Sequence, residues 1–168
     1  MTERAAFVGR CVRPVALLLV ALMAGSVQAS QRPLALLDAP REAPAFALPA
    51  TDGALRRLAD YRGRYVLINF WAVWCAPCRK EMPSMQATYE NLKDEGLELV
   101  AIHVGPSLEM AREFASRLGL DFDILVDDEM ALTDWQVLGL PTTFLVDREG
   151  RLVAEAVGER DWSDPVLV

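Results

Sequence analysis

Two cysteines three residues apart are the side chains of this sequence with the clearest chemical potential. They lie in the segment Trp74-Cys75-Ala76-Pro77-Cys78. If a helix begins at this segment, both sulfurs lie on one side of its first turn, within reach of disulfide geometry. The spacing therefore predicts a disulfide that can open and close.

The two cysteines are expected to act differently. Cys75 would face the unpaired N–H groups and the positive dipole end of the helix, which favour thiolate over thiol. We therefore expect Cys75 to be the attacking sulfur. Cys78, one turn further in, would resolve a mixed disulfide by attacking Cys75. Pro77 suits a first helical turn, because no intrahelical partner awaits its missing N–H.

Other interpretations of the pair are weaker. A purely structural disulfide across three residues closes a very small loop and removes little entropy from the unfolded chain. Zinc needs two further ligands, and the single histidine of the chain, His103, lies in a strand pattern typical of a hydrogen-bonded structural histidine. We therefore expect no resident metal and no cofactor. A non-enzymatic carrier of a soft ion such as Cu(I), or a substrate-holding module, stays open as an alternative.

The segments around the cysteines have the patterns of a strand and a helix. Residues 65–72 (YVLINFWA) are almost continuously apolar, as expected for a strand covered on both faces. Apolar side chains then recur at three- and four-residue steps until Gly96, which suits a helix end. The cysteines are thus expected where a central strand passes into a helix.

The rest of the chain repeats this alternation. Thr51-Asp52-Gly53 marks an opening hairpin. Later strands are expected at 97–104, 122–126, 143–146 and 151–157, and helices at 107–119 and 129–135. This order predicts an α/β fold with a central mixed sheet flanked by helices, parallel in its first part and ending in an antiparallel hairpin.

The first 29 residues have the layout of a secretory signal peptide. Three arginines precede an apolar run at 15–24, and Val27-Gln28-Ala29 supplies a small-residue cleavage pattern. The run is shorter than the roughly 20 residues that span a membrane. We expect cleavage after Ala29 and a periplasmic protein, with an uncleaved membrane tether facing the periplasm as the alternative. Residues 30–44 contain three prolines and are predicted to be a linker before one domain at 45–168.

Composition limits the function further. The 168 residues leave room for one ordinary domain, and the net charge of -7 disfavours binding to nucleic acid. The third cysteine, Cys11, would be lost with the signal peptide. A peroxidase is therefore disfavoured, because no separate peroxidatic cysteine would remain.

The sequence resembles the thioredoxin superfamily, and more closely its exported TlpA-like and ResA-like thiol-disulfide oxidoreductases. The resemblance rests on residues 70–83 (FWAVWCAPCRKEMP) and 138–144 (LGLPTTF), and it covers most of 45–162. It implies a thioredoxin-like fold with an N-terminal hairpin and a central strand-helix insertion. It also implies a protein that reduces or exchanges disulfides in protein substrates, with a membrane-embedded thiol reductant as electron donor. We expect a monomer. A net disulfide oxidant is the alternative within redox chemistry.

The resemblance also implies roles for residues beside the cysteines. Trp74 and Pro77 would support the site. Leu140-Pro141 would be a cis peptide beside the disulfide, where the backbone holds an extended substrate segment. Glu81 would tune the cysteines or relay a proton. Alternatively, Glu81 is a solvated charge that complements the helix dipole.

Two positions and the expected length of the last helix depart from the family pattern. Asn69 stands where plain thioredoxins carry a buried aspartate, six residues before the first cysteine, so we expect no carboxylate there. Thr142 stands where cytochrome-c-maturation members of the CcmG type usually carry an acidic residue. A dedicated role in cytochrome c maturation is therefore less supported than general reduction. Trp162 resembles the start of the family's last helix, which would be short or truncated here.

Overall fold

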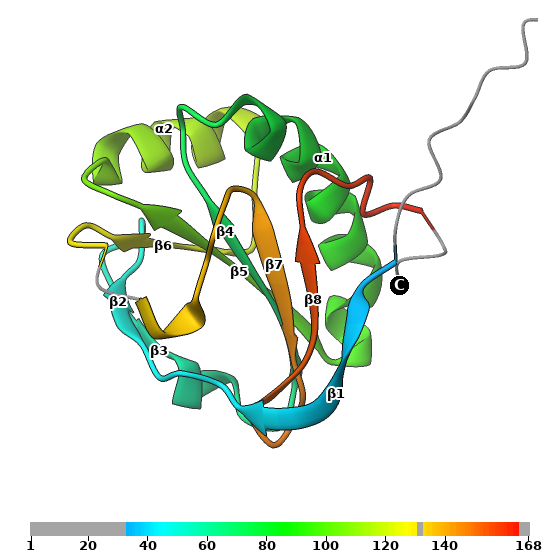
Figure 1. Cartoon of the computed structure of the whole chain (residues 1–168). Helices are drawn as coiled ribbons and strands as arrows, with labels where there is room; N and C mark the ends of the chain where they lie inside the picture. Colours follow the sequence, from blue (N-terminus) through cyan, green and yellow to red (C-terminus); the bar gives the residue numbers. More distant parts are fainter. Residues whose placement is uncertain (1–32, 131–132, 165–168) are drawn as a thin grey trace, which may run out of the picture.

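The computed structural model describes residues 33–130 and 133–164 of the chain (Figure 1). The predicted signal peptide lies outside these described residues. The strands are β1 Ala35–Glu42, β2 Ala47–Pro49, β3 Leu55–Arg57, β4 Tyr65–Trp71, β5 Leu97–Val104, β6 Asp123–Asp127, β7 Thr142–Val146 and β8 Arg151–Val157. The helices are α1 Ala76–Leu92 and α2 Leu108–Leu118, with short 3-10 turns η1 Leu58–Tyr61, η2 Lys93–Glu95 and η3 Thr133–Trp135.

Six strands form one mixed sheet in the order β1-β8-β7-β4-β5-β6 (Figure 1). β4, β5 and β6 are parallel neighbours, and α1 and α2 make the connections between them. β7 pairs antiparallel with β4 and with β8. This arrangement confirms the predicted mixed α/β sheet, with β4 at its centre and the cysteines directly after it.

The two faces of the sheet are covered differently. Both helices pack on one face, over a cluster of buried side chains that includes Trp71, Met82 and Phe114. The other face carries the β2–β3 hairpin, η1 and the indole of Trp135 from η3. Within the described part of the chain, α1 and α2 therefore share one face rather than flanking the sheet on both sides.

Residues expected in the linker contribute a strand instead. β1 pairs antiparallel with β8 at the edge of the sheet, with an irregular register between Leu36 and Arg41. Its side chains are almost all exposed, with only Leu37 packed against the core, so backbone pairing is its main attachment and no apolar period marks it. Pro40 falls within the irregular stretch, where a missing N–H is tolerated at a sheet edge.

Two later segments of the chain differ from the expected helices. The helix predicted at 129–135 is wrong in extent, because the structure has a turn at residues 128 and 129 and only η3, Thr133–Trp135, beyond it. Residues 131 and 132 lie outside the described residues. After Trp162 the chain forms a turn, and most of the expected final helix lies outside the described residues.

Candidate redox site

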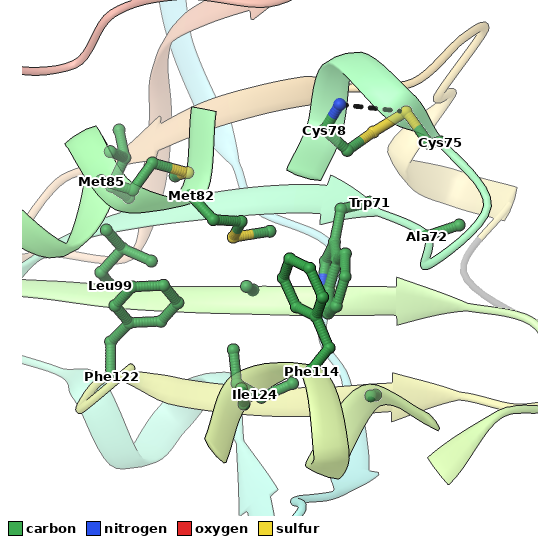
Figure 2. Close-up of a cluster of buried hydrophobic side chains, with 14 of the residues drawn as sticks. Trp71, Ala72, Cys75, Cys78, Met82, Met85, Leu99, Phe114, Phe122 and Ile124 are labelled. Atoms are coloured by element: carbon green, nitrogen blue, oxygen red, sulfur yellow. Dashed lines mark hydrogen bonds between the residues drawn. A yellow bond between two sulfur atoms is a disulfide. The ribbon is translucent and has the colours of Figure 1, made fainter. Parts of the chain in front are cut away.

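Cys75 and Cys78 form a disulfide with an S–S distance of 2.04 Å at the start of α1 (Figure 2). Cys75 is the N-cap residue, and its Sγ accepts a hydrogen bond of 3.3 Å from the backbone N–H of Cys78. Pro77 lies in the first turn, as predicted. Cys75 is 5% exposed and Cys78 is fully buried. The sulfur nearer solvent is thus the one that the helix start stabilises as an anion.

A short turn carries the chain from β4 into this helix. The N–H of Cys75 donates to the carbonyl of Ala72 at 3.0 Å, which closes the turn. Val73 is held at both ends, because its N–H donates to His103 Nε2 at 3.1 Å and its carbonyl accepts from Arg79 Nη1 at 2.9 Å. The next side chain, Trp74, is 71% exposed beside Cys75.

An aromatic layer supports the disulfide from below. Figure 2 shows Trp71 and Phe114 between the cysteines and α2, with Met82 on the neighbouring turn of α1. The rings of Trp71 and Phe114 have centroids 5.2 Å apart, and Trp71 meets His103 edge to face at the same distance. The pair therefore lies on densely packed side chains from β4, β5, α1 and α2.

Glu81 lies one turn beyond Cys78 and is only 1% exposed. Its Oε1 accepts a hydrogen bond of 2.8 Å from Asn69 Nδ2 on β4. Its Oε2 accepts from the backbone N–H of Arg160 at 3.1 Å and from the indole N–H of Trp162 at 3.2 Å. These contacts exclude the alternative that Glu81 is a solvated helix charge.

Burial dominates the ionisation of this carboxyl group. Removal from water raises the pKa of Glu81 to about 7, although the donors from Trp162, Arg160 and Asn69 favour the carboxylate. The group can therefore take up and release a proton near neutral pH. A buried carboxyl with this property, one turn from a redox-active pair, is suited to proton transfer.

Asn69 on β4 holds this carboxyl by a hydrogen bond from its side-chain amide. Its Nδ2 donates both to Glu81 and to Thr143 Oγ1 at 2.9 Å. Its Oδ1 is buried and has no hydrogen-bond partner among the described residues. Position 69 itself thus offers no carboxylate, as expected, and the carboxyl beside it comes from Glu81 on α1.

The late loop contributes a cis peptide between Leu140 and Pro141. Leu140 packs against the cluster of buried residues that contains both cysteines. A hollow of about 470 Å³ lies alongside, and its lining includes Trp74, Leu138, Gly139 and Leu140. Leu138 is 97% exposed at this surface. Of the two expected docking residues, Leu140 thus lines an open, mainly apolar surface together with Trp74, and Pro141 follows it as a buried residue.

Sequence reasoning did not find the partners of Glu81. Arg160 and Trp162 approach it from about eighty positions further along the chain, through a backbone N–H and an indole N–H. A backbone donor has no sequence signal, and Trp162 stood out only as a helix start.

Among the described residues, no group of three or more His, Cys, Asp or Glu side chains is arranged to hold a metal ion.

Comparison with known proteins places this geometry in context. The model of the AhpC/TSA family matches residues 40–155. A protein of Geobacillus kaustophilus named thiol-disulfide oxidoreductase ResA is 43% identical over 111 residues, 66% of this chain. The match spans 64% of that relative, just under two thirds of its length.

Solved structures share the fold. A putative thiol:disulfide interchange protein DsbE from Chlorobium tepidum superposes with a TM-score of 0.69 at 34% identity, over 74% of this chain and 88% of that one. The thioredoxin domain of a thiol-disulfide oxidoreductase from Bacteroides vulgatus gives 0.68 at 28% identity, over 77% and 96%. The expected thioredoxin-like fold is therefore confirmed.

Proposed function

This chain belongs to the AhpC/TSA family, and we propose that it is a thiol-disulfide oxidoreductase that reduces or exchanges disulfides in protein substrates. The observation that carries the proposal is the Cys75–Cys78 disulfide at the first turn of α1, with Cys75 as N-cap. The names of the similar proteins support the same chemistry.

The reaction begins from the reduced pair. The Cys75 thiolate attacks one sulfur of the substrate disulfide, which forms a mixed disulfide and releases the other substrate sulfur as a thiolate. Cys78 then loses its proton and attacks Cys75, which re-forms the Cys75–Cys78 disulfide and releases the second substrate thiolate. Two electrons pass to the substrate, and its two thiolates take up two protons.

Glu81 is the proposed proton acceptor for Cys78. The carboxyl lies one turn away on the same helix and is shielded from bulk water. With a pKa of about 7, it holds enough carboxylate at neutral pH to receive the proton.

We propose that protein substrates dock on the apolar surface beside the cysteines. Leu140 and Pro141 would offer their backbone to an extended substrate segment, and Trp74 and Leu138 would contact its side chains. In addition, Trp74 and Pro77 would support the site by shaping the start of α1. General reduction is favoured over a dedicated role in cytochrome c maturation, because an uncharged Thr142 follows Pro141.

The proposed location is the periplasm, after cleavage behind Ala29, or a membrane surface facing it if the segment is retained. Among residues 33–130 and 133–164, neither helix is long and apolar enough to cross a membrane. Each turnover leaves the Cys75–Cys78 pair oxidised. We propose that a membrane-embedded thiol reductant returns the pair to its reduced state, and that the protein acts as a monomer.

Insulin reduction by dithiothreitol tests the activity. The proposal predicts that the protein accelerates it catalytically and that Cys75→Ser abolishes the acceleration. Stoichiometric uptake of Cu(I) without turnover would instead indicate a metal carrier.

The direction of electron flow needs a separate measurement. A thiol-alkylating mass tag, added rapidly to intact cells, traps Cys75 and Cys78 in their resting state. A reduced pair would support the reductase, whereas an oxidised pair would indicate a net oxidant.

A further inference from the structure

His103 on β5 links the sheet to the turn that precedes Cys75. Its ring is 1% exposed and lies edge to face against Trp71. Nε2 accepts the backbone N–H of Val73 at 3.1 Å, and Nδ1 lies 3.1 Å from the carbonyl oxygen of Gly105. The ring therefore spans from the end of its own strand to the active-site turn.

These two contacts determine the state of the ring. A carbonyl oxygen only accepts, so Nδ1 must carry the hydrogen, and an N–H only donates, so Nε2 must be bare. The ring is neutral in this arrangement. Protonation of Nε2 would point its new N–H at the backbone N–H of Val73, so that two donors face each other and the Val73 N–H loses its acceptor.

The surroundings favour the neutral ring. Burial lowers the pKa of His103, and the hydrogen bond to the Gly105 carbonyl only partly opposes this. Three elements packed around the ring carry charged side chains. These are Arg79, Lys80, Glu81 and Glu90 on α1, Asp123 and Asp127 on β6, and Glu109, Arg112, Glu113 and Arg117 on α2. Glu109 and Arg112 pair with each other, and Arg79 holds the Val73 carbonyl.

We propose that His103 is a positioning residue for disulfide exchange, acting through the Val73 N–H on the turn that presents Cys75. The inference rests on the proposed function, because it concerns the reactivity of the same sulfur. The turn between Ala72 and Cys75 places Cys75 at the N-cap, where the N–H of Cys78 reaches its Sγ. Without the acceptor on His103, the turn loosens and the Cys75 thiolate loses part of its stabilisation.

The single histidine of the chain permits a direct test without substitution. Nitrogen NMR of the imidazole in the natural protein at neutral pH should show hydrogen on Nδ1 and a bare Nε2. Hydrogen on Nε2 would overturn the proposal, since that tautomer cannot accept from Val73. The same spectra, recorded as the pH is lowered, give the range in which the ring gains its second proton.

Two variants then separate positioning from simple packing. His103→Gln can keep an acceptor near the Nε2 position without titrating, whereas His103→Leu offers none. The readout is the alkylation rate of reduced Cys75 by iodoacetamide, followed by peptide mass spectrometry, with thermal unfolding as the fold control. At neutral pH we expect the Leu variant to react about fivefold more slowly and the Gln variant within about twofold of the natural protein, as for loss and retention of one neutral hydrogen bond.

The pH profile supplies the second criterion. Through the range in which the NMR signal titrates, the rate of the natural protein should fall relative to that of His103→Gln. If the Leu variant does not fold, the proposal is still tested by the tautomer of His103 and by the pH profile of the natural protein compared with that of His103→Gln. Equal slowing of both variants, or parallel profiles, would overturn the proposal. Alkylation needs no protein substrate, so failure of the proposed function would appear separately, as absent insulin turnover with this alkylation pattern intact.

Discussion

The side-chain amide of Asn69 donates a hydrogen bond of 2.8 Å to the carboxyl of Glu81, and both groups are buried. This contact joins the central strand to the active-site helix by a buried polar interaction within a largely apolar layer. Because water is excluded there, the ionisation of Glu81 responds strongly to its few partners.

Glu81→Gln should change the pH dependence of exchange while the protein stays folded. The carboxylate form, which can accept the Cys78 proton, increases as the pH rises through about 7. Insulin reduction by the natural protein should therefore gain a rising limb in this range. In the variant that limb should be absent. At alkaline pH its rate should be lower than that of the natural protein by about tenfold or more. Glu90→Gln, an exposed change on the same helix, is the control. Identical profiles for all three proteins would remove Glu81 from proton transfer.

The same carboxyl makes stability depend on pH. Its pKa is about 7 in the folded protein and near 4.5 in the unfolded chain. The folded state therefore holds the proton more tightly, and the stabilisation is complete below the unfolded value and lost as the pH rises through 7. The loss amounts to about 3 kcal/mol in the free energy of unfolding. Urea unfolding of the oxidised protein should show this loss between acidic and alkaline pH, and Glu81→Gln should not. A constant difference between the two proteins across the range would contradict it.

Asn69→Asp should place two acidic groups within hydrogen-bond distance of each other. At most one can ionise readily, so the second proton should be retained to higher pH. We expect the rising limb of the exchange rate to shift to higher pH by about one unit or more. The loss of stability at alkaline pH should also increase. Asn91→Asp, on the exposed surface of α1, controls for the added charge. An unshifted profile in a folded Asn69→Asp protein would show that this contact does not govern Glu81.

Trp74→Ala should weaken docking of protein substrates more than it affects the chemistry. The indole is largely exposed and lines the hollows on both sides of the active-site turn. Its removal should leave stability nearly unchanged and raise KM for insulin by about tenfold, as for loss of an aromatic contact residue. Reduction of a small aromatic disulfide should change little. Leu55→Ala, at an exposed position on β3, is the control. Equal losses with both substrates would assign Trp74 to the reaction itself.

The sequence predicts best those elements whose side chains follow a period. Residues 65–72 read as a buried strand because both faces of β4 are covered, and β5 matches the expected 97–104. Gly96 and Gly119 mark helix ends because both adopt a left-handed conformation, with φ of 95° and 62°. β1 escapes this reasoning, because an edge strand with exposed side chains is specified by backbone pairing with β8.

The site is predictable only in part for a similar reason. Adjacent residues of the motif identify Cys75 and Cys78. The environment of Glu81 depends on Asn69, Arg160 and Trp162, which lie on other elements and meet it only in the folded chain. From sequence alone, a glutamate in the first turns of a helix fits a solvated charge equally well.

Covalent trapping tests the central claim most directly. Reduced Cys78→Ser, mixed with a disulfide-containing protein such as insulin and quenched with acid, should accumulate a mixed disulfide through Cys75, visible as a mass shift on a non-reducing gel. Reduced Cys75→Ser should form little adduct under the same conditions, because the buried Cys78 is not the attacking sulfur. The result that would contradict the account is normal insulin turnover by Cys78→Ser with no trapped complex, or trapping by Cys75→Ser alone.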